Sequence, residues 1–428
     1  MTDNLTIVYT ESSCGWGGQE IRILMEAHGL AVRGHRVMLL CPPQARIYEA
    51  ASRYGVTAAA LPIARKHFDG LFALRRWLSS SPEIDVINTH SSTDSWLAAL
   101  ACRTLRNAPV IVRTRHISTP LDDNPATRWL YQRATAHVVT TGEALRRQLY
   151  REIKMPLRRI TSVPTGVDLV RFRKRSSQEA RAVLGLDQGR CYLGIVATLR
   201  SWKGHAYLIR AFHALAAEYP DWDLLIIGDG PQRHNLEALI GTLALKARVL
   251  MTGNRQDVEL WLNAMDVFAL PSYDGEGVPQ SVLQAMACGL PVVSTTVGAI
   301  AEAVAHEQTG LLVPPHQVQF LRHALTRFMD NAQLRRAFGA AGRVRVEAHF
   351  KLERMLDTME VIFRRVVKGT EVMCGVVGLF GSHHIPMAAW QINLKAFYLL
   401  TLWPLADPIS HLIFETRNVA KNRNQRLR

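Results

Sequence analysis

The stretch MDVFALPSYDGEGVPQSVLQAMACGLPVVSTT (265–296) contains a strand, a turn, a helix and a second strand in succession. Its two ends, 265–272 and 290–296, are short and apolar, whereas 280–287 has apolar residues at helical spacing. Glycines and prolines separate these segments and stop each one from extending into the next. Two strands joined by a helix are the repeating unit of a parallel sheet, so the stretch predicts a doubly wound α/β fold.

The same alternation extends over most of the chain in both directions. Short β-branched runs recur, and longer helical patterns separate them, which predicts a parallel sheet in each half. In the first half the expected strands are LTIVYT (5–10), RVMLL (36–40), DVINTH (85–90), VIVRTRH (110–116) and HVVTTG (137–142). In the second half they are CYLGIVAT (191–198), DLLIIGDG (223–230), RVLMTGN (248–254), MDVFALPS (265–272), LPVVSTT (290–296) and GLLVPP (310–315).

The length of 428 residues suits two α/β domains rather than one. We expect a first Rossmann-like domain over 1–165 and a second over 166–345, with an interdomain cleft between them. The linker is expected near 163–172, where Pro164 and Gly166 provide turn chemistry. A helix over 346–370 is expected to pack back on the first domain, and the tail 371–428 is left without an assigned structure.

Composition and charge narrow the class of protein. The chain is 48% hydrophobic and 20% charged, and its six cysteines form no CxxC pair, so neither a zinc site nor a disulfide framework is indicated. The N-terminus resembles no signal peptide, and no run of about twenty residues is apolar enough to span a membrane, which predicts a cytoplasmic protein. The net charge of +15 suits an anionic membrane face or a phosphorylated substrate, and nucleic acid is not expected because no nucleic-acid-binding signature accompanies it.

The segment EGVPQSVLQAMACGLPVVSTTVGAIAEAV (276–304) resembles the donor-site signature of the family 4 glycosyltransferases. Other segments resemble landmarks of the same family and occur in the right order. These are GWGGQEIRIL (15–24), RGHRVMLL (33–40), LRSWKGHAYLIRAF (199–212), IIGDGP (226–231) and TGLLVPP (309–315). The resemblance covers roughly residues 5–365 and implies the GT-B fold, two facing Rossmann-like domains with the active site in the cleft.

The resemblance also implies an activity: transfer of a sugar from a UDP- or GDP-sugar to a glycan or lipid-linked acceptor, with retention of anomeric configuration. A basic protein of this kind fits synthesis of lipopolysaccharide or another surface polysaccharide, peripherally bound on the inner face of the cytoplasmic membrane. Two alternatives stay open. One is a GT-B protein that only binds or epimerises a nucleotide sugar, and the other is a catalytically decayed membrane-associated partner. A dinucleotide dehydrogenase is excluded because no GxGxxG opens the first helix.

Cations at the carboxyl ends of strands in the second half suit a diphosphate. Arg200 and Lys203 follow the 191–198 strand, and Lys203 is expected to stabilise the charge on the leaving diphosphate. The family usually has an arginine five residues before this lysine, but Thr198 stands there, so Arg200 is expected to replace it. Asn254 ends a neighbouring strand and is also expected at the donor site. The structural alternative is that both cations are solvated surface residues.

The start of the 280–287 helix is expected to hold the rest of the donor. Gly277, Val278 and Pro279 lead into its free N–H groups and positive dipole end, which suit a diphosphate. By resemblance, Glu276 meets the hydroxyls of the donor sugar. The family's second glutamate, which binds ribose, is Gln284 here, and an amide can still form hydrogen bonds. The structural alternatives are a helix-capping acid at Glu276 and a surface amide at Gln284.

Two further groups are expected on the first domain's side of the cleft. Gly17 and Gly18 follow the first strand and precede a helix, so the backbone there can approach an acceptor or a phosphate closely. His116 and His90 both end strands, and the resemblance favours His116 as the catalytic residue near the reacting sugar. A satisfied structural histidine is the alternative at either position.

No metal or other cofactor is expected at the site, because cations and amides can neutralise the diphosphate. Asp221 and Asp223 form a DxD pattern, but they precede their strand and so lie at the opposite edge, where we expect a solvated turn.

In the tail, MCGVVGLFG (373–381) resembles the start of glutamine amidotransferases, whose cysteine must be N-terminal. Cys374 is internal, so no amidotransferase activity is expected. The apolar stretch 388–408 is followed by the basic end RNVAKNRNQRLR (417–428), a combination compatible with an anionic membrane surface, with disorder or simple packing as alternatives.

Overall fold

The first half of the chain forms one seven-stranded parallel sheet in the order β3-β2-β1-β4-β5-β6-β7. The computed structural model describes residues 4–81 and 83–377. The central strands are buried along almost their whole length because helices cover both faces of the sheet. Every strand expected in this half is present, and two short edge strands, β3 and β7, join them. The strands are β1 (Thr6–Thr10), β2 (Arg36–Cys41), β3 (Ala58–Ala60), β4 (Val86–Thr89), β5 (Val110–Arg115), β6 (His137–Thr140) and β7 (Ile160–Ser162).

The helices of this half connect successive parallel strands. Most of them present an apolar face to the sheet, as α4 does with Trp96, Leu97 and Ala98. They are α1 (Gly18–Val32), α2 (Arg46–Ala51), η1 (Ser52–Tyr54), α3 (Phe68–Ser79), α4 (Ser92–Arg103), α5 (Pro125–Trp129), η2 (Leu130–Ala134), α6 (Glu143–Ile153) and η3 (Leu157–Arg159).

The second half forms a separate six-stranded parallel sheet in the order β10-β9-β8-β11-β12-β13, with its own hydrophobic core. All six strands expected from the sequence are present. The strands are β8 (Cys191–Val196), β9 (Trp222–Ile227), β10 (Val249–Gly253), β11 (Val267–Leu270), β12 (Val292–Thr295) and β13 (Gly310–Val313). The helices are α7 (Ser177–Leu184), η4 (Ser201–Lys203), α8 (His205–His213), α9 (Arg233–Thr242), α10 (Val258–Ala264), α11 (Gln280–Ala287), α12 (Ile300–Ala303), α13 (Val318–Asp330) and α14 (Ala332–His349).

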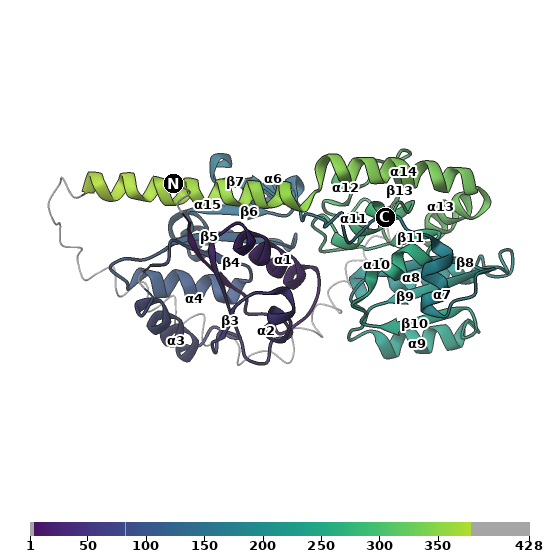
Figure 1. Cartoon of the computed structure of the whole chain (residues 1–428), viewed down its shortest axis with the longest axis horizontal. Helices are drawn as coiled ribbons and strands as arrows, with labels where there is room; N and C mark the ends of the chain where they lie inside the picture. The colour runs from purple at the N-terminus through teal and green to yellow at the C-terminus, as the bar shows by residue number, and fades with distance from the viewer. Residues whose placement is uncertain (1–3, 82, 378–428) are drawn as a thin grey trace, which may run out of the picture.

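The two units lie end to end, and the chain passes between them twice (Figure 1). The first crossing follows β7, and the second joins α14 to the long helix α15 (Leu352–Val377). The crossings run side by side, since the Val167 N–H donates to the Phe350 carbonyl at 2.8 Å and the Leu352 N–H donates to the Val167 carbonyl at 3.1 Å. Gly166 is required there, because a Cβ atom would lie 2.5 Å from the Leu352 Cα.

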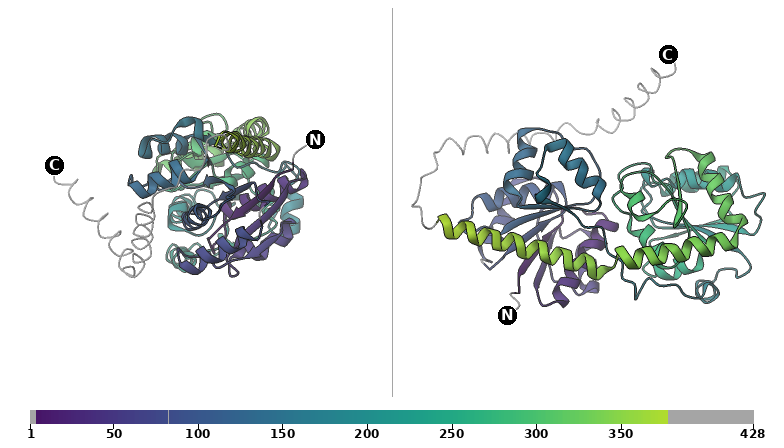
Figure 2. Two further views of the ribbon diagram at one scale, coloured as in Figure 1. Left: turned by 90° about the vertical axis from the view of Figure 1, so that its left-hand side faces the viewer. Right: turned by 90° about the horizontal axis from the view of Figure 1, so that it is seen from above.

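Helix α15 runs from the second unit back along the first, which two views show from different sides (Figures 1 and 2). Its buried face, led by Met359 and Phe363, belongs to the core of the first sheet and packs against α1. Among residues 4–81 and 83–377, no helix combines the length and the apolar character needed to cross a bilayer. Residues 378–381 of the amidotransferase-like segment and all of the stretch 388–408 lie outside the described residues.

Candidate active site

Loops at the carboxyl ends of strands from both sheets touch one another. The loop after β6 reaches the loop after β11, where the Val278 N–H donates to the Thr141 carbonyl at 3.3 Å. The loop after β1 reaches the loop after β8, where the Thr198 hydroxyl donates to the Trp16 carbonyl at 3.4 Å. Ligands of parallel sheets bind at this edge, so the contact region is the candidate active site.

Glu276 and Lys203, predicted from separate segments, form the charged centre of this region. The Lys203 Nζ donates to Glu276 Oε1 at 2.6 Å, and the Ser272 hydroxyl donates to the same oxygen at 2.6 Å. The Glu276 side chain is only 5% exposed, whereas that of Lys203 is 23% exposed. The carboxylate is therefore held in one orientation, and the ammonium group retains donors for an incoming anion.

The turn before α11 brings the backbone of the two domains together. A Cβ atom at Gly277 would lie 2.3 Å from the Thr141 hydroxyl and 3.0 Å from the His116 carbonyl, so no side chain fits at this position. Val278 is buried, and Pro279 occupies the N-cap position of α11 without a side-chain capping bond. One turn further on, Gln284 is only 9% exposed, so it is a buried amide rather than the surface amide considered as an alternative.

His116 and His90 end adjacent strands and contact each other, with 2.9 Å between His116 Nε2 and His90 Nδ1. Burial lowers the pKa of both imidazoles well below the usual value, and His90 and Arg22 lower the pKa of His116 further. Both side chains are therefore neutral at pH 7, and His116 can act as a hydrogen-bond donor or acceptor but not as a cation.

Gly17 and Gly18 face the second domain. Cβ atoms placed on them would lie 3.5 Å from the Thr198 hydroxyl and 3.7 Å from Gln280 Oε1, respectively. The carboxylate of Glu20 borders the same loop, 3.7 Å from the Gly17 Cβ position. A nearby carboxylate repels a phosphate, so this environment favours the acceptor over the phosphate as the neighbour of the glycines.

Two further predicted donor-site residues, Arg200 and Asn254, are exposed at the surface. Arg200 is exposed, and its guanidinium stacks over the Trp202 ring at 5.2 Å. Asn254 is exposed after β10, the edge strand, which two strands separate from β11. Both lie at the carboxyl edge of the sheet, and Arg200 reaches the loop of Glu276 through Trp202, whose indole lies beside Gly275.

The DxD pattern is the expected solvated turn only at Asp221, which is exposed in a turn, and not at Asp223. Asp223 lies at the start of β9 and is largely buried, and it accepts from Arg190 at 2.8 Å and from Arg248 at 2.8 Å. The carboxylate therefore stabilises the amino-terminal edge of the sheet, away from the site. Nowhere in the described part of the chain do three His, Cys, Asp or Glu side chains gather as a metal site would require.

Several residues of the region carried no sequence signal of their own. Ser272 anchors Glu276, and Thr141 contacts the Gly277 turn from the other domain. Trp202 lies beside Gly275, whose Cβ position is 3.8 Å from the indole nitrogen. Ser272 follows an expected strand and precedes Glu276 by four residues, so its place at the strand end was the available clue. Thr141 was recognisable only from the interdomain contact.

Buried carboxylates lie under the first domain's side of the site. Glu11 follows β1 and accepts from the Ser13 N–H at 2.7 Å and from the Ser91 hydroxyl. Burial, together with the nearby carboxylates of Asp94 and Glu20, raises the pKa of Glu11 to about 8. This carboxyl group is therefore largely protonated at neutral pH.

The chain matches two family models in tandem. The model described as Glycosyltransferase Family 4 matches residues 16–171, and the model described as Glycosyl transferases group 1 matches residues 176–345. The lipopolysaccharide core biosynthesis mannosyltransferase LpsB of Rhizobium meliloti is 27% identical over 268 residues, which cover 60% of this chain and 74% of that protein. A GDP-mannose-dependent monoacylated α-(1-6)-phosphatidylinositol monomannoside mannosyltransferase of Corynebacterium glutamicum is 34% identical over 211 residues, covering 47% of this chain and 55% of that protein.

The fold is also found among solved structures. HepE from Anabaena, solved in complex with UDP, superimposes with a TM-score of 0.74 at 18% identity, covering 84% of this chain and all of that one. At this identity the similarity concerns the arrangement of the two domains. The two facing parallel-sheet domains are those of the GT-B fold, as the resemblance implied.

Proposed function

The chain belongs to glycosyltransferase family 4, and we propose that it transfers a sugar from a nucleotide-sugar donor to a glycan or lipid-linked acceptor with retention of configuration. That it is a glycosyltransferase follows from the family. The observation that carries the finer proposal is the Lys203–Glu276 pair at the start of α11, which faces Thr141 and His116 of the other domain. Domain closure would hold donor and acceptor together there and exclude water.

The residues suggest how each part of the donor is held. Lys203 would bind the diphosphate with the N–H groups that open α11, and Gln284 would meet the ribose. Glu276, anchored by Ser272, would accept hydroxyls of the transferred sugar. Neutral His116 would bind the sugar from the first domain. Thr198 leaves the family's arginine position without a cation, so more of the counter-charge falls on Lys203.

Retention is proposed to occur on one face of the sugar. The bond from the anomeric carbon to the diphosphate oxygen breaks while the acceptor oxygen forms its bond to the same face. The acceptor's proton passes to the leaving phosphate oxygen. In this reaction the protein's contribution is positioning and charge stabilisation, and no covalent sugar–enzyme intermediate forms.

For the acceptor and the pathway, we propose a lipid-linked or surface glycan, in lipopolysaccharide or related polysaccharide synthesis. LpsB is a lipopolysaccharide core enzyme, and the Corynebacterium relative acts on a phosphatidylinositol mannoside, so both named relatives support a membrane-anchored glycan. The net charge of +15 would favour approach to an anionic inner membrane face. The donor nucleotide, UDP or GDP, is left to experiment, since the relatives point to both.

A donor screen tests this proposal. Purified protein is mixed with UDP- and GDP-sugars and lipid-linked or free glycan acceptors, and nucleotide release is measured. We expect acceptor-dependent release with one donor, and NMR of the product should show the donor's anomeric configuration. Inverted product would refute retention. Tight nucleotide binding without turnover by any donor would instead favour the binding-protein alternative, which Thr198 and Gln284 keep open.

A further inference from the structure

One acidic side chain links the two domains next to the active site. Glu302 lies on α12 in the second domain, and its carboxylate accepts from two backbone amides of the first domain. The Glu143 N–H donates to Oε2 at 2.8 Å, and the Ala144 N–H donates to Oε1 at 2.8 Å. These amides open α6, so the carboxylate of one domain caps a helix of the other.

Helix α6 has no cap of its own. Its N-cap residue is Gly142, which has no side chain to accept from the free amides. Gly142 is also the residue that admits Glu302: a Cβ atom there would lie 2.5 Å from the Ala299 Cβ and 3.2 Å from Glu302 Oε1. The two segments therefore fit against each other closely, and the cap is supplied across the domain boundary.

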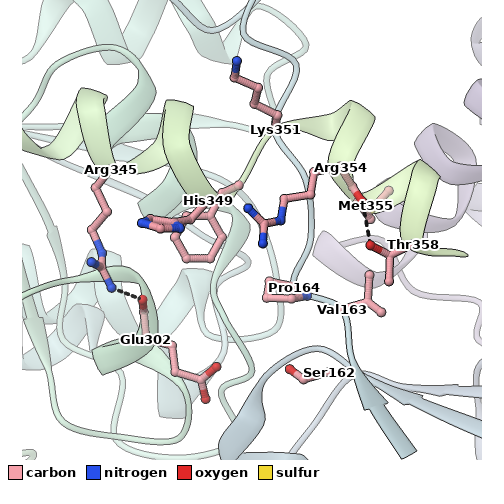
Figure 3. A pocket seen from close by; sticks show the side chains of 11 residues that line it. Ser162, Val163, Pro164, Glu302, Arg345, His349, Lys351, Arg354, Met355 and Thr358 are labelled. Atoms are coloured by element: carbon pink, nitrogen blue, oxygen red, sulfur yellow. Dashed lines mark hydrogen bonds between the residues drawn. The ribbon is translucent and has the colours of Figure 1, made fainter.

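Within its own domain, Glu302 is held from both sides. Arg345 on α14 donates from Nη2 to the Glu302 carbonyl and from Nε to the Ala303 carbonyl, each at 2.7 Å. Figure 3 shows this contact, with the Glu302 carboxylate directed away from Arg345 and toward Ser162 of the first domain. At the other end of α12, the Ala299 N–H donates to the Glu276 carbonyl at 3.4 Å. Glu302 is thus connected to the backbone of the proposed catalytic glutamate.

The first-domain partner is connected to the site in the same way. Thr141 directly precedes the capped segment, and its hydroxyl donates to the His116 carbonyl at 3.1 Å. The cap therefore joins a segment that carries Glu276 to a segment that contacts His116.

Behind the cap the boundary is loosely packed. A cavity of about 550 Å³ separates Glu302, Arg345 and His349 from Ser162 and Pro164 of the linker (Figure 3). Leu145 of α6 is nevertheless buried in the hydrophobic cluster of the second domain, so an apolar contact also holds the two domains together here. The two hydrogen bonds to a charged acceptor, which are strong and directional, add a defined orientation to this contact.

We propose that Glu302 is a positioning residue for sugar transfer: by capping α6 across the boundary, it sets the closed arrangement of the donor and acceptor halves. This inference rests on the proposed function for its kinetic consequence. It also predicts that nucleotide binding in the second domain is coupled to the stability of α6 in the first domain. Through Glu302, bound nucleotide should stabilise the start of α6, and this effect can be measured without sugar transfer.

The test compares Glu302→Ala and Glu302→Gln with Glu143→Ala. The Glu143 side chain pairs with Arg146 on α6 itself at 2.8 Å, so its loss removes a carboxylate from the same helix end without touching the boundary. In Glu302→Ala we expect kcat to fall about tenfold, with donor affinity within about twofold of wild type, since positioning acts on the reacting geometry. Glu302→Gln retains one acceptor oxygen, so its kcat should lie between those of Glu302→Ala and wild type. Glu143→Ala should retain kcat.

Hydrogen exchange of residues 141–146, measured with and without UDP or GDP, supplies the readout independent of activity. Nucleotide should protect this segment in wild type and in Glu143→Ala but not in Glu302→Ala. Equal protection in Glu302→Ala would overturn the proposal, and so would faster exchange with unchanged kcat, which would mean a purely local cap. If wild type transfers no sugar, the proposed function fails, and the protection pattern alone decides the role of Glu302.

Discussion

Two positions next to Glu276, Gly275 and Gly298, have backbone conformations that favour glycine. Gly275 precedes it with φ +72°, and Gly298, at φ +58°, passes so close that a Cβ atom would lie 2.0 Å from the Glu276 carbonyl. Left-handed backbone at these positions favours glycine, and the missing side chain at Gly298 lets its loop pack against the Glu276 backbone. The position of Glu276 thus depends on glycine at both Gly275 and Gly298.

Replacing Glu276 or Gln284 with alanine should affect different steps, turnover for Glu276 and nucleotide binding for Gln284. Glu276→Ala should lower kcat by about 100-fold with little change in nucleotide affinity, because its contact with the sugar matters most in the transition state. Gln284→Ala should weaken nucleotide binding by about 1 kcal/mol, the scale of one neutral hydrogen bond. Calorimetry and turnover on the same preparations separate the two effects. Gln284→Glu serves as the companion variant, and unchanged turnover in Glu276→Ala would remove that residue from the catalytic set.

Glu11 should make stability depend on pH. Its pKa is raised to about 8 in the folded protein from 4.5, so the folded state holds the extra proton between these values. This contribution to stability is complete below pH 4.5 and is lost as the pH rises through 8. Glu11→Gln, which cannot ionise, should therefore raise Tm by roughly 5 °C more at pH 8.5 than at pH 5. Thermal unfolding at both pH values measures this, and an equal shift at both would contradict a raised pKa.

Among the elements, α15 connects the domains most extensively. Its buried residues recur at helical spacing and complete the core of the first sheet, although the helix follows the second domain in sequence. Close approach to α1 depends on Gly29, where a Cβ atom would lie 2.4 Å from a methyl group of Leu356. The second domain is thereby joined to the first by packing as well as by the linker.

Removing a side chain from the buried face of α15 should destabilise the protein much more than removing one from its exposed face. Phe363 is fully buried in the core of the first sheet, so Phe363→Ala should lower the free energy of unfolding by about 3–5 kcal/mol. Val361, on the same helix, is 63% exposed, and Val361→Ala should change the free energy by less than about 0.5 kcal/mol. Urea unfolding compares them. Similar losses in both variants would mean that α15 does not pack as described.

At the scale of the whole molecule, the contacts between the two domains and the charge of Lys203 both bear on ligand binding. The two domains meet through a few loop contacts and α15, so the cleft between them can open and close around a ligand. Lys203 lies at that boundary, 23% exposed, and is available to an anion bound between the domains. We therefore expect Lys203 to supply positive charge to the bound donor.

This arrangement predicts transfer without a divalent metal. Activity should survive an excess of EDTA at nearly its full rate, because Lys203 and the amides opening α11 neutralise the diphosphate. The control is Lys203→Ala, whose activity should fall strongly with or without chelator. Complete loss in EDTA, restored by magnesium or manganese, would show that a metal supplies the counter-charge instead.

The sequence by itself determined the secondary structure and the general place of the site. Strand and helix periodicities are local properties, and all the expected strands formed, with their polar residues gathered at the carboxyl edges. Lys203 and Glu276 were predicted from their motifs. Strands β3 and β7 were missed because each is three residues long, and neighbouring strands rather than propensity bring them into the sheet.

Only the tertiary structure decided which residues share the site across the domain boundary. Glu302 and Glu143 are 159 positions apart, yet the Glu302 carboxylate accepts from the Glu143 N–H in the other domain. Arg200 and Lys203 are three positions apart, yet Lys203 pairs with Glu276 while Arg200 stacks over Trp202. The contacts of Thr141, Gly142 and Glu302 depend on the relative placement of two independently folded sheets. That placement follows from α15 packing and the paired crossings, which no local periodicity encodes.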